Sequence, residues 1–192
     1  QTFQLPADMP CITLGEGNTP LIDDRYDGQR IYYKLEGLNP TGSYKDRASS
    51  VLASFLCGRG IEKAVEDSSG NAGASFAAYA ARAGIQARIY IPESASGPKR
   101  RQIENYGAEL VPVSGPRSAA ADAVLREAEA GVIYASHAFL PFGMAGIATI
   151  AYEIVEQLGE APGTVIAPAG HGSLMLGILR GFKALVAAGQ IE

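Results

Sequence analysis

A lysine follows two successive turn signals at the start of an expected helix. Residues 39–42 read Asn-Pro-Thr-Gly, Ser43 is a suitable helix N-cap, and the residues from Tyr44 to about Cys57 suit a helix. Lys45 therefore lies in the first helical turn, where the partial positive charge of the helix N-terminus disfavours another cation. An amine whose charged form is destabilised is available to attack a carbonyl. The alternative is a solvated surface lysine, as most lysines are.

Two further turns could bind anions. Residues 68–73 read Ser-Ser-Gly-Asn-Ala-Gly, and residues 167–174 read Ala-Pro-Ala-Gly-His-Gly-Ser-Leu. Each follows an expected strand and opens an expected helix, so each presents backbone N–H groups where carboxylates and phosphates bind. The alternatives are an ordinary tight turn for the first segment and a turn of small, closely packed residues for the second.

Short strands and helices alternate from the lysine onward. The expected helices are 44–57, 74–83, a basic helix that closes at Gly107, 118–130, 143–158 and 173–188; the expected strands are 63–66, 86–91, 109–113, 132–135 and 164–167. This alternation predicts βαβ units and a parallel sheet. Upstream of the lysine, residues 31–33 suit the end of a strand, and the polar residues 23–27 suit a solvated loop.

The lysine segment resembles a known motif. Residues 34–36 with residues 39–47, Asn-Pro-Thr-Gly-Ser-Tyr-Lys-Asp-Arg, are similar to the lysine motif of the fold-type II pyridoxal-phosphate enzymes, the tryptophan synthase β-like group. The turns at 68–73 and 167–174 agree with this family in order and spacing. The resemblance implies pyridoxal 5′-phosphate as the cofactor and Lys45 as the catalytic residue that forms a Schiff base with it.

The same resemblance implies roles for the two turns. Asn71 would bind the ring hydroxyl of the cofactor, and the substrate carboxylate would be bound by Ser68, Ser69, Gly70 and Asn71. The cofactor phosphate would be bound, through backbone amides, by Gly170, His171, Gly172, Ser173 and Leu174.

The family also implies an α/β fold with two three-layer αβα domains, each with a parallel sheet, and the cofactor in the cleft between them. Residues 1–50 and 146–192 would form part of the large cofactor-binding domain, and residues 51–145 a smaller mobile domain that carries the asparagine loop. The chain is shorter than family members usually are and has no segment that matches their C-terminal part. We therefore expect a C-terminally truncated chain with an incomplete large domain.

The opening segment points to one subfamily. Residues 13–21, Thr-Leu-Gly-Glu-Gly-Asn-Thr-Pro-Leu, resemble the N-terminal segment of threonine synthases, which convert O-phosphohomoserine and water to threonine and phosphate. His171 and Ser173 depart from the Gly-Asn-x-Gly-Asn that threonine synthases often show in the phosphate loop. The alternatives are a threonine or serine dehydratase, a cysteine or cysteate synthase-type β-replacement enzyme and, from another class, a non-catalytic fragment or binding module.

Other candidates are weaker. His137 follows an expected strand and suits a loop or packing histidine better than a catalyst. Gly146, Thr149 and Glu153 resemble a helical segment that lines the cofactor side in the family. The run Lys99-Arg100-Arg101 suits a solvated helix face, with binding of a substrate phosphate as the alternative.

Composition limits the partners. The chain has 192 residues, of which 47% are hydrophobic and 19% charged, as in an ordinary globular protein. A net charge of −4 argues against nucleic acid or a membrane surface as a partner, and no apolar run could span a bilayer. Cys11 and Cys57 are too few and too far apart for a disulfide framework or a metal cluster. We expect a cytoplasmic enzyme that acts on a small amino acid and whose full-length form is a homodimer.

Overall fold

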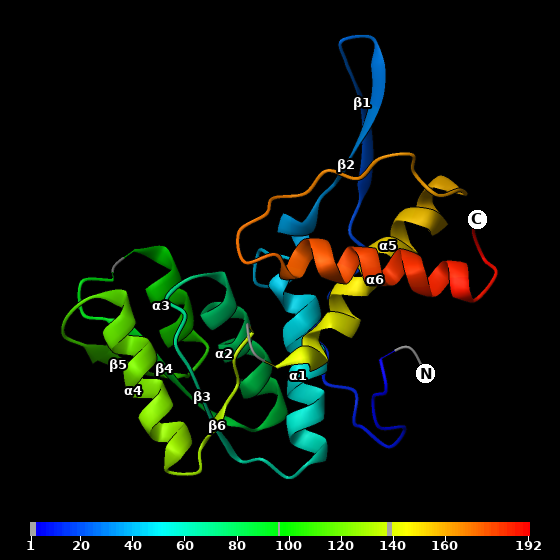
Figure 1. The fold of residues 1–192 in the computed structure, drawn as a ribbon. Helices are drawn as coiled ribbons and strands as arrows, with labels where there is room; N and C mark the ends of the chain where they lie inside the picture. Colours follow the sequence, from blue (N-terminus) through cyan, green and yellow to red (C-terminus); the bar gives the residue numbers. More distant parts are fainter. Residues whose placement is uncertain (1–2, 96, 138–139) are drawn as a thin grey trace.

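The computed structural model of the chain describes residues 3–95, 97–137 and 140–192. One part of it is built around a four-stranded parallel sheet, on the left in Figure 1. The strands are β3 (Lys63–Glu66), β4 (Gln86–Pro92), β5 (Glu109–Val113) and β6 (Ile133–Tyr134), in the order β5-β4-β3-β6. All three pairings are parallel, which confirms the sheet that the alternation of elements predicts.

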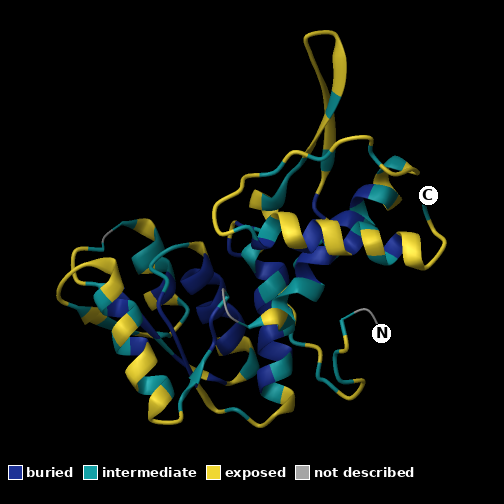
Figure 2. Ribbon diagram, in the orientation of Figure 1, coloured by how far each residue is buried: buried dark blue, intermediate teal, exposed yellow. Residues whose placement is uncertain are grey.

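Helices cover both faces of this sheet. Helix α4 (Arg117–Glu129) covers one face, and α1 (Lys45–Gly58), α2 (Asn71–Ala83) and α3 (Pro98–Asn105) lie on the other. Successive strand residues point to opposite faces. Val65 therefore packs in the cluster with α4, whereas its neighbour Ala64 packs in the cluster with α1 and α2. Figure 2 shows the central strands β3 and β4 and the helix α2 as the most deeply buried elements of this part.

The second part is a pair of closely packed helices, α5 (Met144–Leu158) and α6 (Ser173–Ala187), on the right in Figure 1. Their contact depends on glycine. A Cβ added at Gly177 would lie 2.4 Å from the Ile147 side chain, and one at Gly181 would lie 2.4 Å from the Ala148 carbonyl oxygen. Only residues without a side chain allow the two backbones to approach this closely.

Helix α1 connects the two parts. Its C-terminal half contributes Leu52 and Leu56 to the core beside the sheet, and its N-cap Tyr44 and the residue Ala48 pack against the cluster of α5 and α6. The helix is continuous through residue 50, where the sequence places a domain boundary, and the boundaries at residues 50 and 146 stay a prediction. Because α1 packs on both parts, its first turn lies at their junction.

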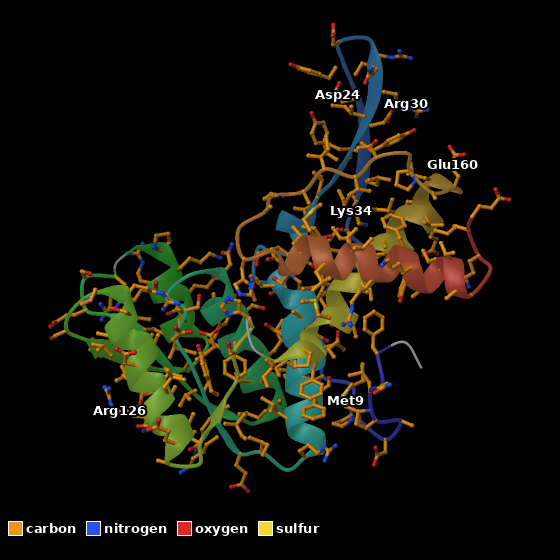
Figure 3. The ribbon with its side chains drawn as sticks, in the orientation of Figure 1. Met9, Asp24, Arg30, Lys34, Arg126 and Glu160 are labelled. Carbon is orange, nitrogen blue, oxygen red and sulfur yellow. The ribbon has the colours of Figure 1, made fainter. Side chains whose placement is uncertain are left out.

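The polar residues 23–26 form part of a strand, so the expectation of a loop at 23–27 is wrong, although these residues are exposed as expected. Strand β1 (Leu21–Tyr26) pairs antiparallel with β2 (Gln29–Lys34), and the hairpin carries Asp24 and Arg30 far out from the helices (Figure 3). Its two-residue turn has positive φ at both Asp27 and Gly28. Asp-Gly is a strong signal for such a hairpin turn, so the sequence contained the information.

The strand expected at residues 164–167 is also not formed. Val165 and Ala167 pack against the cluster of α5 and α6, while Ile166 is 93% exposed, an alternation that suits a strand. No strand among the described residues pairs with this segment, and a strand requires a hydrogen-bonded neighbour.

Short 3-10 helices, η1 (Glu36–Leu38) and η2 (Pro141–Gly143), precede α1 and α5. In the described part of the chain, every helix is too short or too polar to cross a membrane.

Candidate active site

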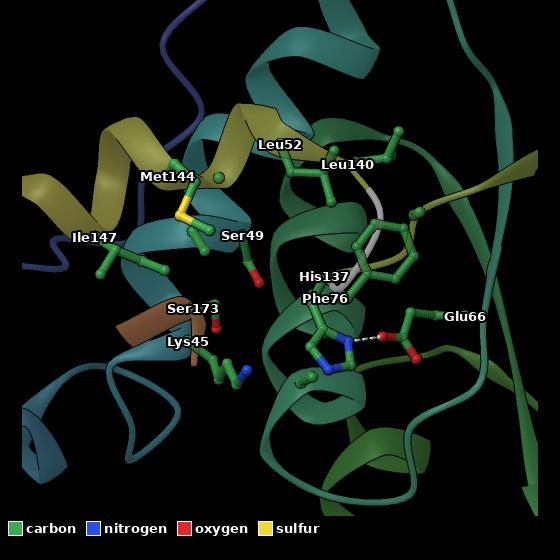
Figure 4. Close-up of a pocket in the computed structure, with 14 residues that line it drawn as sticks. Lys45, Ser49, Leu52, Glu66, Phe76, His137, Leu140, Met144, Ile147 and Ser173 are labelled. Atoms are coloured by element: carbon green, nitrogen blue, oxygen red, sulfur yellow. Dashed lines mark hydrogen bonds and ion pairs between the residues drawn. The ribbon is translucent and has the colours of Figure 1, made fainter. Parts of the chain in front are cut away.

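A cleft at the junction of the two parts contains Lys45 (Figure 4). Residues from six segments line it. The polar lining residues are Lys45 and Ser49 on α1, Glu66 at the end of β3, His137 after β6, and Ser173 at the start of α6. The carboxyl ends of parallel strands and the start of a helix are common positions for ligand sites in α/β proteins.

Lys45 is half-buried and points into this cleft, so it is not a solvated surface lysine. Its amine lies 5.0 Å from the centre of the Tyr44 ring. Among the described residues it has no hydrogen-bond or ion-pair partner. Ser43 is not the N-cap: Tyr44 occupies that position without a side-chain cap, and the buried Ser43 hydroxyl has no hydrogen-bond partner in the described structure.

The other polar residues of the lysine motif bind the protein itself. The buried Asp46 carboxylate accepts hydrogen bonds from the backbone N–H of Thr41, at 2.6 Å, and from the Thr41 hydroxyl. The Asn39 side chain accepts a hydrogen bond from the N–H of Gly17 at 3.0 Å and donates one to the Glu36 carbonyl oxygen at 2.8 Å. These contacts fix the turn that leads into α1, and they leave Lys45 as the motif residue with a charged group directed into the cleft.

Arg47 is the centre of a buried network of charges. Its guanidinium, 1% exposed, donates hydrogen bonds to Glu36 at 2.7 Å and to Glu153 at 2.6 Å and 2.8 Å. Lys34 forms a second ion pair with Glu153 at 2.6 Å, so two cations face two anions. Burial alone would raise the pKa of Glu153, but hydrogen bonds from Arg47, Lys34 and the Asn18 backbone lower it to about 2.

The opening segment, residues 13–21, belongs to the same scaffold. The Thr19 hydroxyl donates a hydrogen bond to Glu36 at 2.7 Å, and its carbonyl oxygen accepts one from Lys34 at 2.6 Å. The Glu16 carboxylate accepts a hydrogen bond from the Tyr79 hydroxyl on α2 at 2.7 Å. Burial would raise the pKa of Glu16, but hydrogen bonds, including those from Ser50 and Tyr79, lower it. Sequence reasoning recognised this segment by resemblance and did not find its structural role.

The turn 68–71 lies at the rim of the cleft. Ser68, Ser69 and Gly70 are half-buried, Asn71 is exposed at the first position of α2, and the adjacent Ala72 lines the cleft. The helix begins three residues earlier than expected. A Cβ added at Gly73 would lie 1.8 Å from the Ser68 carbonyl oxygen, so glycine is required for the turn to fold back onto the helix.

The turn 170–174 reaches the cleft through one residue. Ser173 is buried and lines the cleft at the start of α6, after Gly172, whose φ of +90° is in the left-handed region. Gly170 and His171 are exposed, and Leu174 packs in the cluster of α5 and α6. The structure therefore brings Lys45 and Ser173 into one cleft, with the rest of the two turns beside it.

Two candidates occupy other positions than expected. Gly146, Thr149 and Glu153 face α1 and do not line the cleft: Thr149 accepts a hydrogen bond from Arg47 at 2.8 Å, and a Cβ at Gly146 would lie 1.7 Å from the Arg47 carbonyl oxygen. Lys99 is not part of a solvated face, because its amine donates a hydrogen bond to the Thr41 carbonyl oxygen at 3.2 Å. Helical periodicity alone could not show which neighbour each face meets.

His137 and Glu66 form a pair that sequence reasoning missed. His137 Nδ1 lies 2.6 Å from Glu66 Oε1, and Glu66 is 1% exposed. The His137 ring also meets the His171 ring edge-on, with centres 6.2 Å apart. The sequence shows a glutamate and a histidine after the carboxyl ends of two expected strands. It does not show that these two strands are neighbours in the sheet, which is what brings the two side chains together. No cluster of metal-ligating side chains occurs in the part of the chain that the structure describes.

Known proteins have sequences similar to this chain. Residues 12–192 match the protein family described as "Pyridoxal-phosphate dependent enzyme". Threonine synthase of Halalkalibacterium halodurans is 37% identical over 182 residues, which cover 92% of this chain and 51% of the relative. Threonine synthase of Methanocaldococcus jannaschii is 37% identical over 189 residues, which cover 94% of this chain and 46% of the relative. The chain thus spans about half the length of these curated relatives.

Solved structures share the fold. Maize serine racemase has a TM-score of 0.80 at 26% identity, covering 90% of this chain and 54% of that one. The O-acetylserine dependent cystathionine beta-synthase from Helicobacter pylori has a TM-score of 0.78 at 27% identity, covering 88% of this chain and 60% of that one. Because the family match covers residues 12–192, the chain belongs to the pyridoxal-phosphate dependent enzymes of fold-type II, and its cofactor is pyridoxal 5′-phosphate.

Proposed function

We propose that the whole protein is an amino-acid lyase or synthase of the threonine synthase type, which converts O-phosphohomoserine and water to threonine and phosphate. The observation that carries this proposal is the position of Lys45, a half-buried amine that faces a cleft while the polar residues around it bind the scaffold. The relatives named threonine synthase support the choice of reaction.

The residues of the cleft fit the cofactor. The Lys45 amine lines the cleft and is available to bind its aldehyde carbon. Two positions earlier, outside the cleft lining, the buried Ser43 hydroxyl has no hydrogen-bond partner in the described structure. The start of α6, at Gly172 and Ser173, presents the backbone N–H groups of a helix N-terminus, where a phosphate would be bound. When bound, the cofactor supplies an electron sink for the bonds that break at the substrate α-carbon.

The chain's own residues supply the rest of the chemistry. In our proposal the Lys45 amine would hold the cofactor and would accept the proton from the substrate α-carbon. Asn71 binds the cofactor ring, residues 68–71 bind the substrate carboxylate, and residues 170–174 bind the cofactor phosphate. The apolar residues that line the cleft exclude water from the reacting atoms.

One observation favours a second reaction. Beside Lys45 the cleft is lined by apolar side chains, including Leu52, Phe76 and Met144. Such a lining suits a substrate with an uncharged side chain better than a phosphorylated one. A threonine or serine dehydratase, or a β-replacement enzyme of the cysteine synthase type, is therefore the second candidate.

Absorption spectra of the protein with added pyridoxal phosphate test the cofactor role of Lys45. We expect a visible band of lysine-bound cofactor in the parent and none in Lys45→Ala. Parallel assays of phosphate release from O-phosphohomoserine and of keto acid from threonine or serine then separate the two candidate reactions. A parent protein without the band would favour the non-catalytic alternative.

We further propose that the whole protein is a cytoplasmic homodimer. Light scattering of the whole protein tests whether it is a dimer.

A further inference from the structure

The His137–Glu66 pair lies inside the cleft that holds Lys45. Glu66 closes strand β3, His137 follows β6, and both line the cleft with the lysine. In Figure 4 the Lys45 amine points toward the His137 ring, and Glu66 lies on the far side of that ring. In this view the imidazole lies between a buried carboxylate and the amine, and 26% of the His137 side chain is exposed.

The surroundings of Glu66 define the orientation of the imidazole. Glu66 Oε2 also accepts a hydrogen bond from the backbone N–H of Ser68, so both oxygens of this carboxyl group contact neighbouring groups of the protein. The neighbouring carboxylate of Asp67 is engaged elsewhere, by Arg117 at 3.0 Å and by the Tyr134 hydroxyl at 2.7 Å. An ionised Glu66 can only accept, so Nδ1 of His137 carries the hydrogen of their bond. Nε2 is then left for a partner in the cleft.

We propose that His137 is a second catalytic acid–base residue in this cleft, and that Glu66 is the positioning residue that holds its Nε2 toward the substrate. The proposal rests on the proposed function, because it assigns a task in that reaction. Lys45 acts at the α-carbon, and His137 acts on the leaving group of the substrate side chain. A carboxylate behind an imidazole is a known arrangement for such proton transfer.

The proton balance of this step is closed. When the bond between the side-chain carbon and the leaving oxygen breaks, its electron pair stays on the oxygen, which takes the proton from Nε2 of the imidazolium. The ring becomes neutral. An attacking water then forms its bond to carbon through oxygen and releases a proton, which returns to Nε2. His137 therefore ends in the state in which it began, and no oxidant or reductant takes part.

Histidine NMR tests the geometry without any turnover. The two histidines of the chain, His137 and His171, are assigned with His171→Asn, and their ring nitrogen shifts are recorded where the rings are neutral. We expect Nδ1 of His137 to carry the hydrogen, and we expect Glu66→Gln to shift the ring toward the other tautomer, because the amide of glutamine can donate. Glu104→Gln, which removes a carboxylate from an exposed pair on α3, should leave the ring unchanged. A ring protonated on Nε2 in the parent, or one indifferent to Glu66→Gln, would overturn the proposal.

Leaving-group kinetics test the chemistry. The whole, cofactor-loaded protein and its His137→Asn variant are compared on an amino acid with an oxygen leaving group and on its analogue with chloride on the same carbon. Chloride departs without a proton. We therefore expect the reaction of His137→Asn to be slower than that of the parent by about 100-fold or more on the substrate with the oxygen leaving group, and to be little changed on the chloride analogue. Exchange of the α-proton in deuterated water, which depends on Lys45, should persist in the variant. Equal losses for both leaving groups, or none for either, would refute the role.

These readouts separate the two proposals. A parent protein that binds no cofactor or turns over neither analogue contradicts the proposed function. In that case the histidine NMR still decides whether Glu66 holds His137 in the assigned orientation.

Discussion

The guanidinium of Arg47 lies 2.6 Å from the carboxylate of Glu153, although 106 positions separate the two residues in the sequence. The contact joins the helix that begins with Lys45 to α5, and Arg47 is 2% exposed. Most polar residues of the lysine motif, residues 34–36 and 39–47, thus stabilise the fold around Lys45. They hold one amine at the junction of the sheet and the α5–α6 pair.

Replacement of Glu153 by glutamine tests the network of charges around Arg47. The variant leaves Arg47 buried with Glu36 as its remaining anionic partner, and breaking a buried pair in this way costs about 3–5 kcal/mol. We expect a loss of that size in the free energy of unfolding, measured with urea. Glu156→Gln, on the exposed side of the same helix, should change it by less than about 0.5 kcal/mol. Equal effects of the two variants would contradict the role of the network.

The pKa of Glu153 predicts a pH dependence. It is about 2 in the folded protein against an ordinary value of 4.5, so the carboxylate stabilises the fold fully above about 4.5. This contribution is lost as the pH falls from about 4.5 toward 2. We expect the difference in unfolding free energy between the parent and Glu153→Gln to shrink over that interval. A difference that stays constant would show that the Glu153 carboxylate does not titrate in that interval.

Gly146→Ala should separate α1 from α5. The added Cβ would lie 1.7 Å from the Arg47 carbonyl oxygen, and backbone atoms cannot move away cheaply. Overpacking of this kind costs about 1–3 kcal/mol or more, so we expect a lower melting temperature. Gly163→Ala is the matched control, because a Cβ there meets no atom within 4 Å. A control as damaging as Gly146→Ala would count against close packing as the cause.

Ser43→Ala should have opposite effects on the free and the cofactor-loaded protein. The Ser43 hydroxyl is buried without a partner among the described residues, so its removal should stabilise the cofactor-free protein by about 1 kcal/mol. If the hydroxyl binds the cofactor, affinity should fall about fivefold to tenfold in a titration followed by absorption. Ser49→Ala removes the partner of the Ser75 hydroxyl, 2.8 Å away, and should instead destabilise the free protein. Unchanged affinity in Ser43→Ala would show that the Ser43 hydroxyl does not bind the cofactor.

Lys99→Met should loosen the turn before Lys45. The Lys99 amine donates a hydrogen bond to the Thr41 carbonyl oxygen at 3.2 Å, beside Gln102, which donates to the same oxygen at 3.1 Å. A hydrogen bond from a charged donor contributes about 1.5–3 kcal/mol. We expect faster amide hydrogen exchange in residues 41–44 of this variant. Arg101→Met, at an exposed position of the same basic run, should leave exchange unchanged.

Local rules were sufficient for much of the fold. The helices 45–58, 144–158 and 173–187 and the parallel strands 63–66, 86–92 and 109–113 lie within a few residues of their predicted ranges. The hairpin of β1 and β2 could also have been predicted from the sequence, because Asp27-Gly28 is a strong signal for its turn. The segment 164–167 was not, because its composition suits a strand while pairing depends on a neighbour that local sequence does not specify.

The sequence by itself determined the family, the cofactor and the place of Lys45 in the first turn of a helix after a rigid turn. These follow from contiguous motifs and from local backbone preferences. Only the tertiary structure decided which side chains share the cleft with that lysine. Glu66 and His137 are 71 positions apart and meet because β3 and β6 are neighbours in the sheet. Strand order and the close packing of α1, α5 and α6 are set by long-range burial and glycine contacts, and no local pattern encodes such contacts.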